Sequence, residues 1–158
     1  MAYSTYTPVT GVIQNITPLT PSCCDQLLTL ATNGGIVTFT VSKDTYIPNN
    51  LQLRRGMRAS AFYDADLPVP LIFPPRYQAE AVAVLARNET AVLQYFDENL
   101  LAADGSLKLT PGPTTTITSA NGQRFTCSPG KNLLLVFYSI TTRSLPPQTT
   151  PHRILVFC

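Results

Sequence analysis

Short runs of β-branched and aromatic residues recur throughout this chain, and a glycine, proline, asparagine or aspartate closes nearly every run. Strands joined by turns produce this pattern, whereas amphipathic helices need apolar residues at every third or fourth position. The sequence therefore predicts an all-β protein. The predicted strands are residues 10–16, 26–32, 35–42, 57–64, 78–85, 91–96, 106–110, 114–119, 123–127, 133–138 and 153–158. Residues 97–103, where acidic side chains precede a Leu/Ala run, are predicted as a helical connector of one or two turns.

The composition excludes several other architectures. Charged residues make up 13% of the 158 residues, and threonine occurs 21 times against 11 basic plus 9 acidic side chains. Helical bundles, coiled coils and charge-rich disordered chains all need more glutamate, lysine and arginine than this. Asn33-Gly34, Asp104-Gly105 and Asn121-Gly122 are predicted to form tight hairpin turns, because these dipeptides tolerate positive φ angles.

Several short fragments occur twice in the same order, which indicates an internal duplication. The pairs are Val12-Ile13-Gln14 with Val92-Leu93-Gln94, Asn33-Gly34 with Asn121-Gly122, Phe39-Thr40-Val41-Ser42 with Phe125-Thr126-Cys127-Ser128, and Phe62-Tyr63 with Phe137-Tyr138. The duplication predicts two domains, residues 1–86 and 87–158. Each would hold about five strands, which suits a small barrel of the oligonucleotide/oligosaccharide-binding (OB) type. A single β-sandwich or jelly roll is the alternative.

The amino-acid sequences of both halves resemble those of a group of small uncharacterised β-rich proteins of Gram-positive, clostridia-like bacteria. The segments that resemble this group are residues 11–13, 56–57, 61–64, 70–79, 104–109 and 141–151. The resemblance covers most of the chain and implies tandem OB-like barrels. It implies no activity and no functional residue.

The sequence contains few groups that could perform catalysis, and no enzyme activity, cofactor or metal site is predicted. His152 is the only histidine, it has no Gly-x-Ser-x-Gly partner, and it is predicted to lie at the surface. Asp64-Ala65-Asp66 is predicted as an exposed turn rather than a cation site. Asp97-Glu98-Asn99 begins like a calcium loop, but Ala102 occupies the position where that loop needs glycine.

Four cysteines leave the redox state open. Adjacent residues of an extended chain face opposite sides, so Cys23 and Cys24 are expected to have separate partners. Cys127 is predicted to be part of the core, and Cys158 is the last residue. The sequence shows neither the basic start and apolar core of a signal peptide nor an apolar run long enough to span a membrane. These features predict a cytoplasmic protein that does not associate with membranes, and in the cytosol its thiols are expected to be reduced. On a cell or spore surface, intersubunit disulfides through Cys23, Cys24 or Cys158 are the alternative.

Charge is unevenly distributed, because no acidic residue follows Asp104. The basic residues beyond that point are Lys108, Arg124, Lys131, Arg143 and Arg153. Such a surface could contact an anion, and aromatic residues lie nearby in the sequence. Single-stranded nucleic acid or a glycan is therefore one predicted partner.

Apolar segments favour a different partner. Residues 133–138 are apolar on both faces, which predicts either a doubly covered central strand or an interface through Leu133, Leu135 and Phe137. The proline-rich residues 67–77 and 145–151 are predicted as loops, and Leu71 to Phe73 is expected to cover a barrel end. Together these features predict a non-catalytic module for self-assembly or protein binding, with nucleic-acid or glycan binding as the alternative.

Overall fold

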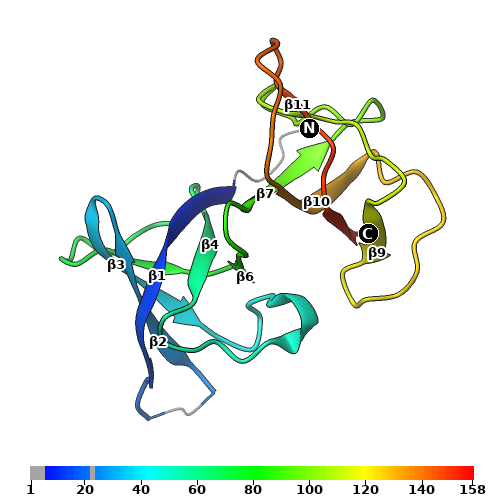
Figure 1. The fold of residues 1–158 in the computed structure, drawn as a ribbon. Helices are drawn as coiled ribbons and strands as arrows, with labels where there is room; N and C mark the ends of the chain where they lie inside the picture. Colours follow the sequence, from blue (N-terminus) through cyan, green and yellow to red (C-terminus); the bar gives the residue numbers. More distant parts are fainter. Residues whose placement is uncertain (1–5, 22–23) are drawn as a thin grey trace. The chain divides into compact units, whose positions relative to one another are not determined.

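The computed structural model of the protein describes residues 6–21 and 24–158, and it is all-β, as predicted. The chain divides into two compact units, of which the N-terminal one ends at Ala86 and the C-terminal one begins at Arg87. Figure 1 shows curled sheets in both units. Within the described ranges, no helix is long and apolar enough to cross a membrane.

The N-terminal unit is built on a sheet with the order β5-β3-β2-β1-β4-β6. Its elements are β1 (Tyr6–Pro18), β2 (Gln26–Thr32), β3 (Gly35–Val41), the 3-10 turn η1 (Pro48–Asn50), β4 (Arg58–Asp64), β5 (Arg76–Gln78) and β6 (Ala81–Val84). As predicted, Asn33-Gly34 joins β2 to β3 in a tight hairpin, in which Thr32 pairs with Gly35.

The link between β5 and β6 connects the two sides of this sheet. β5 pairs in parallel with β3, and the next residue, Ala79, donates its backbone N–H to the Thr40 carbonyl at 3.0 Å. One residue later, Glu80 donates to the Phe62 carbonyl of β4 at 2.8 Å. The strand pairings therefore lead from β5 through β3, β2, β1 and β4 to β6, and the chain segment between β5 and β6 links the two edges of the sheet.

Alternate residues of these strands fill the interior, as the two-residue period of a strand requires. The most completely buried side chains of this core cluster come from β1, β2, β3, β4 and β6: Ile13, Leu28, Leu30, Phe39, Ala59, Ala61 and Val82. Tyr63 and Tyr77 pack against the cluster while remaining half-buried.

The C-terminal unit has a sheet with the order β7-β10-β12-β9 and a short parallel pair, β11-β8. Its strands are β7 (Thr90–Phe96), β8 (Lys108–Leu109), β9 (Thr116–Ser119), β10 (Asn132–Tyr138), β11 (Gln148–Thr149) and β12 (Arg153–Phe157). Its core cluster consists of Phe96, Ala102, Leu107, Leu109, Leu134, Val136, Ile154 and Val156.

Part of the strand pairing is similar in the two units, although their sheets have different strand orders. In the N-terminal unit β1 pairs antiparallel with β4, β4 pairs antiparallel with β6, and β5 pairs in parallel with β3. In the C-terminal unit β7 pairs antiparallel with β10, β10 antiparallel with β12, and β12 in parallel with β9. The repeated fragments at Val12 and Val92 lie on β1 and β7, and those at Phe62 and Phe137 lie on β4 and β10.

The fragments at Phe39 and Phe125 do not lie on equivalent strands. Residues 123–127, predicted as a strand, contain only one isolated bridge, between Arg124 and Thr118. The parallel partner of β12 is β9 and not this segment.

The predicted helix at residues 97–103 is wrong. The Asp97 carboxylate accepts hydrogen bonds from the backbone N–H groups of Asn99 at 2.8 Å and Leu101 at 3.0 Å. Leu100 has a φ angle of 62°, which no right-handed helix tolerates. The acidic residues that suggested a helix start therefore form a turn instead.

Candidate binding pockets

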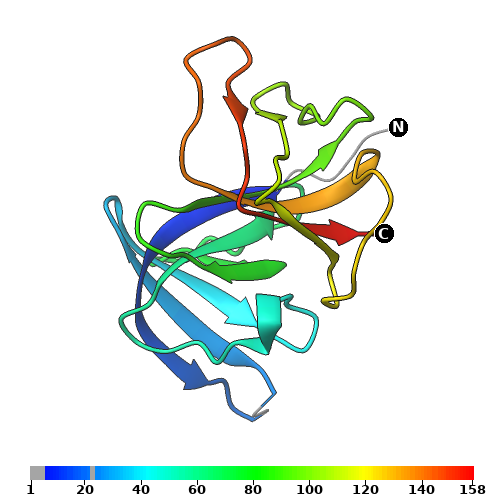
Figure 2. The same ribbon diagram turned by 45° about the vertical axis from the view of Figure 1, so that its right-hand side comes forward.

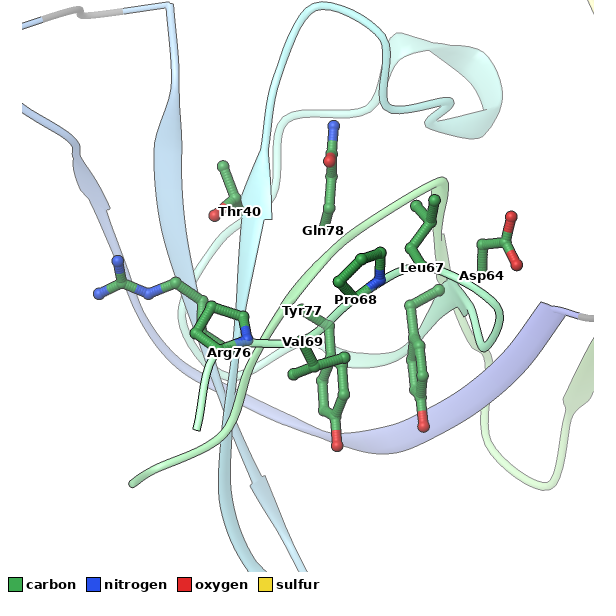
Figure 3. A pocket seen from close by; sticks show the side chains of 10 residues that line it. Thr40, Asp64, Leu67, Pro68, Val69, Arg76, Tyr77 and Gln78 are labelled. Carbon is green, nitrogen blue, oxygen red and sulfur yellow. The ribbon is translucent and has the colours of Figure 1, made fainter. Parts of the chain in front are cut away.

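A pocket of about 340 Å³ lies in the N-terminal unit, where β4 ends and β5 begins (Figure 3). Its walls come from the two strand ends, from Thr40 on β3, and from the loop that connects β4 to β5. The lining residues are Thr40, Tyr63, Asp64, Leu67, Pro68, Val69, Pro70, Arg76, Tyr77 and Gln78. We call it the tyrosine pocket.

Two stacked tyrosine rings form its aromatic wall. The ring centroids of Tyr63 and Tyr77 are 4.0 Å apart and the planes differ by 14°. Phe39 lies behind them, 5.8 Å from the Tyr77 centroid. The parallel register of β3 and β5 places Phe39 beside Tyr77, and the curl of the sheet brings β4 and its Tyr63 to the same point. Burial, followed by the neighbouring Tyr77, raises the pKa of Tyr63 above its ordinary value of 10.0.

Charged groups lie on either side of the aromatic wall. Figure 3 shows Asp64 and Arg76 on opposite sides of the pocket, with Pro68 and Val69 between them. One Asp64 carboxylate oxygen accepts the Asp66 backbone N–H at 2.9 Å. The Nε of Arg76 is buried and has no hydrogen-bond partner among the described residues. An incoming segment can therefore meet an apolar surface with a carboxylate at one end and a guanidinium at the other.

The loop next to the pocket is exposed rather than closing a barrel end, so that expectation is wrong. Leu71 is fully exposed and Phe73 is 93% exposed. The loop is anchored where it returns to the sheet, because both the N–H and the hydroxyl of Thr38 donate to the Pro75 carbonyl at 2.8 Å. Leu67 to Pro70 line the pocket, so the prolines and this anchor leave the apolar tip in solvent.

A second pocket, of about 350 Å³, lies in the C-terminal unit. It lies between the end of β10 and the start of β12, as the tyrosine pocket lies between β4 and the β5–β6 segment. Its lining is rich in hydroxyl groups: Thr110, Ser139, Ile140, Thr141, Thr142, Gln148, Thr149, Thr150 and His152. We call it the threonine pocket.

The threonine pocket contains a serine–histidine pair. The Ser139 hydroxyl and the His152 Nε2 are 2.7 Å apart, and both residues are exposed. The surface position of His152 agrees with the sequence, but its serine partner was not predicted, because a proline-containing loop separates the two residues. In the described part of the chain no carboxylate lines this pocket, so the pair has no third member to orient the histidine.

The basic residues of the second half do not come from one surface element. Lys108 is on β8, Arg153 is on β12, and Lys131 precedes β10. Arg124 is in the loop between β9 and β10, and Arg143 is in the loop between β10 and β11. These two loops, yellow and orange in Figure 2, point to different ends of the C-terminal unit. The guanidinium of Arg153 lies over the Phe137 ring, 5.6 Å from its centroid.

The candidate interface on β10 is mostly buried. Leu135 is 0% exposed and Phe137 is 4% exposed, while Leu133 is half-buried. Leu134 and Val136 on the opposite face of the strand belong to the core cluster. β10 is therefore a central strand of its sheet, between β7 and β12, and its Leu134 and Val136 face the core cluster of this unit.

The cysteines are at the surface wherever they are described. Cys127 and Cys158 are exposed free thiols and Cys24 is exposed, whereas Cys23 is outside the described residues. The prediction of a core position for Cys127 is wrong because residues 123–127 do not form a strand. No three His, Cys, Asp or Glu side chains gather as a metal site within the described ranges.

Comparison with known proteins adds no relative. The chain matches no known family model, and no curated protein is significantly similar to it.

Proposed function

We propose that this protein is a non-catalytic protein-binding module, made of two OB-like units that arose by duplication. The duplication is supported by the shared order and direction of strand pairing, β1-β4-β6 with β5-β3 and β7-β10-β12-β9. It is supported further by the two pockets, which both lie at the connection from the fourth to the fifth strand. In OB folds this connection belongs to the ligand-binding loops.

The tyrosine pocket is the observation on which the proposal depends. Grooves lined by aromatic rings and prolines recognise extended, proline-containing peptide segments, whose preformed conformation lowers the entropic cost of binding. The stacked Tyr63 and Tyr77 rings, 4.0 Å apart, supply such a surface beside Pro68 and Val69. The exposed Leu71 and Phe73 extend the apolar surface that a bound segment could contact.

The proposal gives no catalytic role to Ser139 and His152. A serine hydroxyl is a weak nucleophile unless a histidine base, itself oriented by a third group, removes its proton. The lining of the threonine pocket supplies the hydroxyl and the imidazole but no carboxylate from the described residues. The short Ser139–His152 hydrogen bond is interpreted as part of the loop structure.

Peptide titration tests the proposal. The chain contains no tryptophan, and 2 of its 7 tyrosines line the pocket, so a change in tyrosine fluorescence can follow binding there. We expect a capped peptide containing Leu-Pro-Pro to change this fluorescence in a saturable manner, and a matched peptide with both prolines replaced by alanine to bind more weakly.

Two variants localise the binding. Val69→Lys puts a charge into the tyrosine pocket from a position that is 39% exposed, and it should abolish the saturable change. Leu51→Lys changes a similarly exposed residue outside the pocket, and it should leave binding unaltered. Equal binding by both variants, or no binding by the wild-type protein, would contradict the proposed function.

A further inference from the structure

We propose that the segment bound by the tyrosine pocket is the loop around Leu145 of a second copy of this chain, so that molecules associate head to tail. This inference depends on the proposed peptide-binding function and names its partner. The donor is the loop between β10 and β11 of one molecule, and the acceptor is the tyrosine pocket of the next.

The donor loop presents one apolar residue on a preformed support. Leu145 is 96% exposed and is followed by Pro146 and Pro147. The base of the loop is closed by Thr142 and Gln148, which exchange hydrogen bonds of 2.8 and 3.0 Å. Within the loop, the Ser144 hydroxyl donates to the Pro146 carbonyl at 2.8 Å. A leucine held out on an ordered loop loses little conformational entropy when it binds.

The acceptor matches this segment in size and in character. A volume of about 340 Å³ lies at the lower end of ligand pockets, which favours a short segment over a large ligand. The faces of proline rings pack well on aromatic rings, and the stacked Tyr63 and Tyr77 provide such a surface. Leu67 and Val69 supply an aliphatic wall for the Leu145 side chain.

One pair of charges on the two surfaces is complementary, whereas Arg76 at the other end of the pocket has no acidic counterpart on the donor loop. Arg143 is exposed and lies two residues before Leu145. Asp64 lines the pocket, and the exposed Asp66 lies next to it in the turn. The donor loop is far from any acidic residue in the sequence, because none follows Asp104. A segment that offers leucine, two prolines and an arginine thus meets tyrosines, aliphatic side chains and a carboxylate.

The donor and the acceptor are different surfaces, so the contact is heterologous. Heterologous contacts form rings when the rotation between copies closes and open chains when it does not. In both cases every molecule uses one donor loop and one acceptor pocket, and blocking either surface should stop growth.

Light scattering after size-exclusion chromatography, under reducing conditions and over a range of concentrations, measures the assembly. We expect the wild-type mass to rise with concentration. Leu145→Asp blocks the donor and Val69→Lys blocks the acceptor, and each variant alone should remain monomeric. Mixed together, they still have one intact donor and one intact acceptor, so the mixture should form a dimer and nothing larger.

Further variants distinguish this contact from non-specific hydrophobic association. Leu51→Asp changes another exposed leucine and should assemble like the wild type. Arg143→Asp should weaken association about tenfold, and adding Asp64→Arg to the same chain should restore most of it. Equal melting temperatures for all variants would show that folding is intact.

The outcomes also distinguish this inference from the proposed function. A wild-type protein that is monomeric at every concentration overturns the head-to-tail contact. This holds also if the monomer arises because the loop binds the pocket of its own chain. If the Leu-Pro-Pro peptide still binds such a monomer, the binding function stands with a different partner. A mixture of the two blocked variants that stays monomeric also overturns the inference.

Discussion

Gly11 lies on β1 close to the backbone of β2. A Cβ atom at this position would be 2.5 Å from the Ala31 carbonyl oxygen and 3.0 Å from its carbon. The register of β1 against β2 also changes between Ile13 and Asn15, close to this position. The glycine is therefore required by the space available and not by its φ angle.

Gly11→Ala should destabilise the protein because the new methyl group must displace backbone atoms. Overpacking of this kind costs about 1–3 kcal/mol. Denaturant unfolding followed by circular dichroism measures the change in the free energy of unfolding. Gly34→Ala is the control, because its nearest atom would be 4.0 Å away. Equal losses for both variants would contradict the steric explanation.

The raised pKa values of two tyrosines make the free energy of unfolding depend on pH in the alkaline range. Burial, and then the neighbouring Tyr77, raises the pKa of Tyr63 above 10.0, and burial raises the pKa of Tyr138. A group whose pKa is higher in the folded state than in the unfolded state stabilises the fold at pH values below its unfolded-state pKa. This contribution to the free energy of unfolding is lost as the pH rises through its folded-state pKa. The free energy of unfolding should therefore fall above pH 10.0.

Tyr63→Phe combined with Tyr138→Phe removes both ionisations while keeping the rings. We expect the stability of this double variant to decline less with pH than that of the wild type, as measured by urea unfolding between about pH 8 and pH 11. Parallel curves for the two proteins would rule out a contribution from these phenols.

At the scale of elements, local sequence predicts the long strands well. β2 has the predicted bounds, and the strands at β3, β4, β7, β10 and β12 differ from prediction by a residue or two at their ends. These strands contain enough alternating apolar residues to be recognised without knowledge of their partners. β5 and β11 were not predicted, because proline-rich segments precede both and each strand depends on a distant parallel partner.

The tyrosine pocket was missed for the same reason. Its walls come from β3, from the end of β4 and from β5, and the pairing that unites them is visible only in the folded chain. A usable signal existed in Tyr63 and Tyr77, which lie on either side of a proline-rich loop with an apolar tip. Such a loop between two tyrosines indicates a candidate aromatic site at a strand connection.

The turn after β7 depends on a single carboxylate. Asp97 accepts two backbone hydrogen bonds there, and Leu100 returns a third to the Asp97 carbonyl at 3.0 Å. Asp97→Ala removes both side-chain bonds, so we expect a loss of about 1–3 kcal/mol in the free energy of unfolding. The neighbouring Glu98→Ala should change it by less than about 0.5 kcal/mol. Chemical denaturation measures both, and a smaller effect at Asp97 than at Glu98 would contradict the turn.

At the scale of the whole molecule, the uneven charge has two interpretations. The absence of acidic residues after Asp104 predicted an anion-binding second half. In the fold those cations come from separate strands and loops, and Arg153 lies over the Phe137 ring. Dispersed charges release few counterions on any one nucleic-acid strand and give weak binding. The same asymmetry leaves the Leu145 loop with a cation and no acidic residue near it in the sequence, which suits contact with Asp64.

Oligonucleotide binding separates these interpretations. We expect a labelled single-stranded oligonucleotide to show no saturable change in anisotropy with this protein at physiological salt, because no basic cluster follows a strand backbone. Charge reversal by Arg124→Glu with Lys131→Glu should then have no effect on head-to-tail assembly, whereas Arg143→Asp should weaken it. Salt-dependent binding that disappears with Arg124→Glu and Lys131→Glu would instead assign the basic half to nucleic acid, because only a shared anionic ligand makes distant cations act together.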